Sequence, residues 1–150
     1  MATPWVGLVI AGGKASSHLK QVERSLDYGR TFQELPQLPN IISALCLVIV
    51  DKERIFTAGG FTPHPSSTVL NTAHMLYLTE SSRGWVELQS MSYPRWIHTC
   101  GKVGPELNPE KIVVVGGCKD GSCHTRLKSV EIYTIATGSW ETGKQGSPRE

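Results

Sequence analysis

The sequence predicts an all-β chain made of three similar units of about 50 residues each. Three features recur in each unit and support this fold class. They are a short apolar run that ends in two glycines, an alternating run that ends in tyrosine, and a closing proline. Apolar runs this short, bounded by glycine and proline, favour strands over helices. Their fixed order is typical of a repeat protein.

The apolar run is predicted to be the second strand of each unit. It spans residues 7–13, 54–60 and 111–117. The two glycines at its end allow the backbone to turn with positive φ and to approach a neighbouring segment closely. These pairs are Gly12-Gly13, Gly59-Gly60 and Gly116-Gly117.

A tyrosine is predicted to end the third strand, and a second aromatic residue to begin the fourth. The tyrosines follow the second glycine by 15, 17 and 16 residues, and the second aromatic follows after a further 4, 8 and 7 residues. Because these rings have an apolar body and, in tyrosine and tryptophan, a polar tip, we expect them to pack between neighbouring sheets. The pairs are Tyr28 with Phe32, Tyr77 with Trp85, and Tyr133 with Trp140.

Prolines mark where one unit ends and the next begins. Pro39, Pro94 and Pro148 are separated by steps of 55 and 54 residues. The first strand of the next unit is expected after each proline, over residues 40–50 and 95–100. The predicted units are therefore residues 5–39, which lacks a first strand of its own, 40–94 and 95–148.

Composition and charge exclude several classes of protein. The chain has 15 basic and 13 acidic residues in 150, a net charge of +2, which is too small to indicate a nucleic-acid-binding or membrane-binding surface. The longest apolar run, residues 44–50, is much shorter than the roughly 20 residues that span a bilayer. The first residues do not resemble a signal peptide.

The order of glycine pair, tyrosine and tryptophan at this period resembles the kelch repeat. The second and third units carry the resemblance most clearly, whereas Phe32 stands in the first unit where tryptophan is usual. The resemblance implies four-stranded antiparallel blades of a β-propeller. Since propellers typically have 4–8 blades, about three blades imply an open, partial propeller that self-assembly would complete.

The resemblance also implies a binding role. Kelch propellers mostly bind proteins, so the expected function is a protein-interaction module. Two specific forms are the substrate-recruiting part of a ubiquitin ligase adaptor and a cytoskeleton-associated scaffold. A catalytic propeller of the galactose-oxidase or sugar-processing type, or an inactive fragment, is the alternative. No cofactor, metal or catalytic residue is expected, because phosphate-binding, nucleophile and zinc motifs are absent from the sequence.

Partner-binding residues are expected where loops gather on one face of such a propeller. The candidates are Arg95, Trp96, Phe61, Lys119 and Arg126. The loops after the glycine pairs carry four cations, Lys14, Lys20, Lys119 and Arg126, against Asp120, a net charge of +3. This charge predicts an acidic peptide as partner, the alternative being a surface that is merely solvated. The turns at the opposite end have a net charge of −1.

The four cysteines leave the compartment undecided. Cys118, Cys123 and His124 form the local cluster that most suggests a metal site. However, zinc needs about four ligands, and no second cysteine pair lies nearby in the sequence. We expect free thiols here; a Cys118–Cys123 disulfide is the alternative, and it would favour an extracellular protein over a cytoplasmic one. Cys46 and Cys100 are expected to be small core residues.

Overall fold

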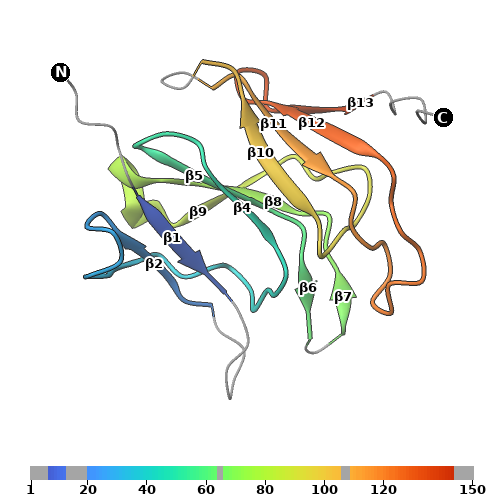
Figure 1. Ribbon diagram of the computed structural model, residues 1–150, viewed down its shortest axis with the longest axis horizontal. Helices are drawn as coiled ribbons and strands as arrows, with labels where there is room; N and C mark the ends of the chain where they lie inside the picture. The colour runs from blue at the N-terminus through green and yellow to red at the C-terminus, as the bar shows by residue number, and fades with distance from the viewer. Residues whose placement is uncertain (1–6, 13–19, 64–65, 106–108, 144–150) are drawn as a thin grey trace.

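The computed structural model describes residues 7–12, 20–63, 66–105 and 109–143. Within these ranges the chain forms three antiparallel sheets that lie side by side, with a small hairpin projecting from the middle one (Figure 1). The all-β fold class and its organisation into antiparallel blades are confirmed.

Each sheet is one blade, with strands in chain order. The first blade contains β1 (Leu8–Ala11), β2 (Val22–Ser25) and β3 (Gln33–Leu35). The second contains β4 (Cys46–Ile49), β5 (Arg54–Ala58), β8 (Ala73–Tyr77) and β9 (Trp85–Leu88). The third contains β10 (Thr99–Val103), β11 (Lys111–Val115), β12 (Val130–Thr134) and β13 (Ser139–Gly143). The hairpin is β6 (Phe61–Thr62) and β7 (Thr68–Val69), and a 3₁₀ segment, η1 (Leu78–Arg83), separates β8 from β9.

The hydrophobic core lies between the blades. A small cluster around Val22, Leu38 and Ile42 joins the first blade to the second. A larger cluster joins the second blade to the third, where the ring of Phe56 lies 5.8 Å from Tyr133. Because side chains alternate along a strand, each blade has two faces and packs a different one against each neighbour.

The tryptophans lie at equivalent places in the second and third blades. Trp85 pairs across the strands with Leu76, and Trp140 with Tyr133. The indole of Trp85 donates a hydrogen bond to the carbonyl oxygen of Pro36 (2.9 Å) and that of Trp140 to the carbonyl of Gln89 (2.6 Å). Each ring therefore ties its own blade to the end of the preceding one.

The prediction that Tyr77 is the counterpart of Tyr133 is wrong. In the second blade Ile55 pairs with Leu76, and in the third the equivalent Ile112 pairs with Tyr133. Leu76 is fully buried, whereas Tyr77 is 36% exposed. A shift of one residue moves a side chain to the other face of the sheet, so the buried position belongs to Leu76.

The prediction for Tyr28 is also wrong, because this residue lies three positions past the equivalent strand residue. The equivalent position of the first blade is Ser25, which pairs with Leu8. Tyr28 lies beyond β2, with φ of +61° and an exposed fraction of 82%. It packs against no neighbouring sheet.

The first strands are shorter than predicted and begin later. The structure has β4 in place of residues 40–50, and β10 begins at Thr99 instead of residue 95. The residues before each strand instead form a turn that passes over the glycines, and Ala44 and Ile97 adopt positive φ at the same place in the two turns. This turn shapes the face described next.

Candidate protein-interaction face

Arg95 is a structural residue, so its prediction as a partner contact is wrong. Its side chain is fully buried and forms an ion pair with Glu131 of β12, with 2.5 Å between the nitrogen and the carboxylate oxygen. It also donates a hydrogen bond to the carbonyl of Gly116 (2.9 Å). A buried charge requires such partners, and here they fix the turn before β10 to the third blade.

Glu131 was not singled out from the sequence, because its partner lies 36 residues away. Its carboxylate also accepts a hydrogen bond from the backbone N–H of Ser92 (2.6 Å). In the second blade the equivalent position, paired across the sheet with Thr57, is His74. The position of Arg95 is taken in the second blade by Ile42, which is also buried. The second blade therefore has isoleucine and histidine where the third blade has the Arg95–Glu131 ion pair.

The glycine pairs allow the turns to pass close to the strands. Gly59 has φ of +64°, and a Cβ there would lie 2.4 Å from the carbonyl oxygen of Arg95. A Cβ on Gly117 would lie 2.7 Å from the carbonyl oxygen of Trp96. Gly12 and Gly60 make similarly close approaches to residues 42 and 43. Gly13 lies outside the described residues.

Phe61 and Trp96 join the loops of the second and third blades. Their rings stack with centroids 5.1 Å apart, and both side chains are half-buried. The indole of Trp96 also donates a hydrogen bond to the carbonyl oxygen of Asp120 (2.8 Å). The aromatic pair therefore stays partly exposed to solvent and helps to hold the Asp120 loop in place.

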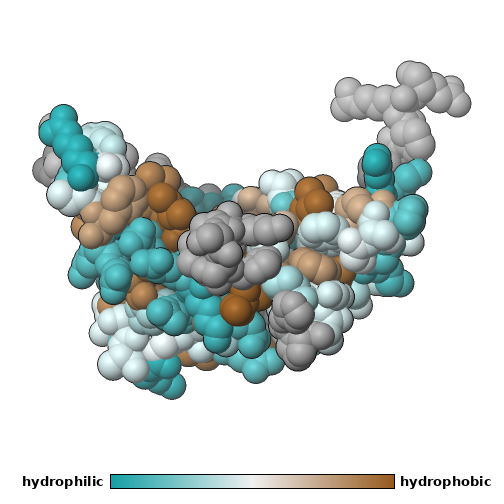
Figure 2. All heavy atoms as spheres, turned by 90° about the horizontal axis from the view of Figure 1, so that it is seen from below, coloured by the Kyte–Doolittle hydropathy of each residue, from teal (hydrophilic) through white to brown (hydrophobic). Residues whose placement is uncertain are grey.

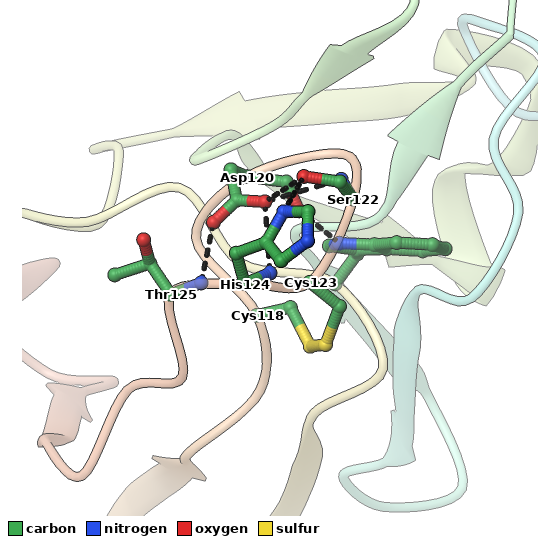
Figure 3. The surroundings of a disulfide bond; sticks show 7 residues. Cys118, Asp120, Ser122, Cys123, His124 and Thr125 are labelled. Atoms are coloured by element: carbon green, nitrogen blue, oxygen red, sulfur yellow. Dashed lines mark hydrogen bonds between the residues drawn. A yellow bond between two sulfur atoms is a disulfide. The ribbon is translucent and has the colours of Figure 1, made fainter.

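The loop between β11 and β12 is closed by a disulfide between Cys118 and Cys123 (Figure 3). The expectation of free thiols at these two positions is therefore wrong. Cys46 and Cys100 lie in the core, as predicted, and the structure joins them in a second disulfide, which was not predicted. Cysteine pairing depends on the distance between backbones, which the sequence does not give.

Asp120 organises this loop from within (Figure 3). Its carboxylate accepts hydrogen bonds from the hydroxyl of Ser122 (2.7 Å) and from the backbone N–H groups of His124 (3.1 Å) and Thr125 (2.6 Å). These donors, the Ser122 hydroxyl foremost, hold the pKa of Asp120 well below its usual range. The aspartate is thus a structural anion whose bonding capacity is used by its own loop.

Ser122, His124 and Asp120 contain the residue types of a hydrolytic triad but not its arrangement. The Ser122 hydroxyl lies 2.6 Å from Nδ1 of His124 and 2.7 Å from the Asp120 carboxylate. In a triad the carboxylate orients the histidine, whereas here it binds the serine. We interpret the contacts as bonds that shape the loop.

The basic side chains of the face point outward. Lys119 and Arg126 are exposed, and the ammonium of Lys119 lies 5.5 Å from the ring centroid of Tyr93. Lys20 is half-buried and donates a hydrogen bond to the carbonyl of Pro39 (3.4 Å). Lys14 lies outside the described residues. Figure 2 views the molecule from the side on which β6 and β7 project, where hydrophilic and hydrophobic residues are interspersed.

A shallow groove of about 360 Å³ lies beside the β6–β7 hairpin, near the junction of the first and second blades. Its lining is mixed, with hydroxyl and amide groups beside two aliphatic side chains: Lys20, Asn40, Ile41, Thr62, Ser66, Thr68 and Leu70. This groove was not predicted, because it is formed by segments from two blades.

His98 lies in the junction between the second and third blades. If Gly59 carried a Cβ atom, that atom would overlap the His98 ring. If Gly117 carried one, it would overlap the Cβ atom of His98. Burial, with a smaller contribution from the nearby charge of Arg95, lowers the pKa of His98 to about 4. The imidazole is therefore neutral at physiological pH.

The described residues contain no cluster of three or more His, Cys, Asp or Glu side chains that could hold a metal ion. Within the described ranges, no helix is long and apolar enough to cross a membrane.

Comparison with known families identifies the third blade. Residues 106–145 match the family model of the Kelch motif. This segment of the chain is similar to a kelch repeat. The matched segment contains β11, β12, β13 and the disulfide-closed loop, and the second blade repeats its strand order and its glycine and tryptophan positions. Kelch repeats generally mediate protein interactions. A search of curated proteins finds no match to the chain.

Proposed function

We propose that the chain is a protein-interaction module that binds an acidic peptide on one face. We call this the loop face and define it by Phe61, Trp96, Lys119, Arg126 and the loop of residues 118–127. The proposal rests on the kelch architecture together with the charge and rigidity of this loop.

One observation carries the proposal: the cations of the loop face are not neutralised by the loop's own carboxylate. Asp120 accepts its hydrogen bonds from Ser122, His124 and Thr125, and in the described part of the chain neither Lys119 nor Arg126 forms an ion pair. Exposed cations beside aromatic edges attract carboxylates and offer apolar contact to the rest of a peptide. The disulfide and the Trp96 contact reduce the ordering that binding would require.

The experiment that tests this function is an array of acidic, neutral and basic peptides probed with the whole chain. We expect binding to the acidic peptides alone, weakened about tenfold or more by Lys119→Glu with Arg126→Glu, because two attractive charges become repulsive. Lys52→Glu is the matched control, since Lys52 is exposed on the turn at the opposite end of the second blade. Equal binding to all three peptide classes, or equal loss in the control, would exclude the loop face.

The specific roles proposed for such a module are substrate recruitment in a ubiquitin ligase and attachment to the cytoskeleton. Both rest on the kelch family alone. Copurification of the tagged chain with ligase subunits or with actin distinguishes them, and recovery that survives Lys119→Glu with Arg126→Glu would assign the contact to another surface.

A further inference from the structure

The Cys46–Cys100 disulfide joins two different blades. Cys46 lies on β4 and Cys100 on β10, with their Cα atoms 5.9 Å apart, a usual separation for a disulfide. These are the first strands of the second and third blades, and the cysteines are 54 residues apart in sequence. The bond therefore joins the second and third blades, the same two blades whose loops are joined by the Phe61–Trp96 contact.

The two cysteines do not occupy equivalent positions of their blades: Cys100 lies one residue after the position equivalent to Cys46. Cys46 pairs across its sheet with Ala58, and the equivalent residue of the third blade, which pairs with Val115, is Thr99. Because side chains alternate, Cys100 points to the opposite face of its blade from Thr99. That offset turns Cys46 toward the third blade and Cys100 toward the second.

The strands carrying the cysteines are held together by other contacts as well. The backbone N–H of Ile97 donates a hydrogen bond to the carbonyl of Ala44 (3.2 Å), and the ammonium of Lys102 donates one to the carbonyl of Val50 (3.0 Å). These bonds flank the cysteines along both strands. Contacts other than the disulfide therefore also hold β4 and β10 side by side.

We propose that Cys46–Cys100 is a covalent staple between blades, formed by oxidative maturation of the chain in an oxidising compartment. All four cysteines of the chain are paired in the structure. Stable disulfides persist in secretory and extracellular environments and are rare in the cytosol. This inference goes beyond the proposed function and holds whatever the partner is.

The bond forms by exchange with a donor disulfide, either glutathione disulfide or an oxidised dithiol of a thiol oxidoreductase. One cysteine thiolate attacks a donor sulfur, forms a mixed disulfide and releases the first donor thiolate. The second cysteine thiolate then attacks the sulfur of the first and releases the second donor thiolate. Two electrons pass to the donor, which takes up the two protons lost by Cys46 and Cys100.

Alkylation and peptide mapping test the staple directly. The chain is refolded in a glutathione redox buffer, unfolded without reductant, treated with iodoacetamide and digested. We expect a crosslinked peptide that contains Cys46 and Cys100 and no alkylation at either residue. Alkylated Cys46 and Cys100 beside an intact Cys118–Cys123 bond would overturn the proposal, as would a bond from Cys46 to Cys118 or Cys123.

A register control separates designed proximity from chance oxidation. The variant Thr99→Cys with Cys100→Ala keeps one cysteine on β4 and one on β10 but places the second on the opposite face of β10. We expect both thiols of this variant to remain alkylatable in the same buffer. Crosslinking of Cys46 at the wild-type extent would show that register does not matter and would contradict the inference.

Thermal unfolding measures what the staple contributes. We expect Cys46→Ala with Cys100→Ala to lower Tm by about 10 °C, because opening so long a loop increases the entropy of the unfolded chain. A reductant should lower Tm by a similar amount in the wild type and much less in this variant. The variant Cys118→Ala with Cys123→Ala, whose loop is short, serves as the comparison. An unchanged Tm in the first variant would refute the staple.

Discussion

Gly59 has a stringent steric requirement. Its φ of +64° disfavours any residue with a Cβ, and a Cβ would also meet the Arg95 carbonyl. We predict that Gly59→Ala destabilises the chain by about 2–4 kcal/mol, since strain and overlap act together. The measurement is the free energy of unfolding in urea.

Gly138 provides the control for this substitution. Its φ of +67° is almost the same, but a Cβ there would come no closer than 3.6 Å to the Tyr133 hydroxyl. Gly138→Ala should therefore cost only about 1 kcal/mol, from backbone strain. Equal losses at both positions would mean that the approach of the Arg95 carbonyl is unimportant.

His98 makes stability depend on pH. Its pKa is lowered to about 4 in the folded chain by burial and by Arg95, whereas an unfolded histidine titrates near 6.5. Between these values the unfolded state binds more protons, so stability decreases as the pH falls from about 6.5 to about 4. The loss should reach at most about 3 kcal/mol, and urea unfolding at a series of pH values measures it.

The second blade supplies the matched variant for His98. Leu45 occupies the equivalent position there, since it lies where a Cβ added to Gly60 would meet it, as His98 does beside Gly117. We expect His98→Leu to flatten the pH dependence without preventing folding. Some slope should remain from His74, whose pKa burial also lowers. An undiminished slope would assign the effect to other groups.

At the level of the strand, register decides which aromatic residue matters. Tyr133 lies in the core against Phe56 and Trp140, whereas Tyr77 faces solvent at the end of β8. We predict that Tyr133→Ala costs about 3–5 kcal/mol and Tyr77→Ala less than about 1 kcal/mol. Chemical denaturation of the two variants tests this, and a larger loss at Tyr77 would contradict the register.

The sequence predicted the strands of the second and third blades because glycine pairs and tryptophans mark them unambiguously. It misplaced Tyr77 because spacing alone tolerates an error of one residue, and in a strand that error reverses the face. It misplaced Tyr28 by three residues, which puts this tyrosine beyond the end of β2. The groove beside Lys20 and the burial of Arg95 were missed for a different reason. Both depend on contacts between blades, which local patterns do not encode.

The partner-binding role of Phe61, Trp96, Lys119 and Arg126 stays a prediction. The structure brings the rings of Phe61 and Trp96 together and leaves Lys119 and Arg126 exposed. Arg95 was misjudged because arginine is rarely buried without a partner, and Glu131 is distant in sequence.

Across the described residues, buried apolar contact is distributed unevenly between the two junctions. The cluster between the second and third blades includes Phe56, Met75, Val114 and Tyr133, whereas the described part of the one around Val22 has fewer buried residues. We predict that amides of β1 and β2 exchange with deuterium faster than those of β5 and β11, because local opening follows the amount of buried apolar contact. Uniform protection across all three blades would contradict this order.

The one-residue offset of Cys46 and Cys100 sets the second blade apart from the third. Cysteines at equivalent positions would lie on the same side of their sheets and could not face each other across the junction. The crosslink therefore depends on a difference between the two blades. It removes the equivalence of the blades: the second and third blades form a fixed pair whose order could not be exchanged without losing the bond.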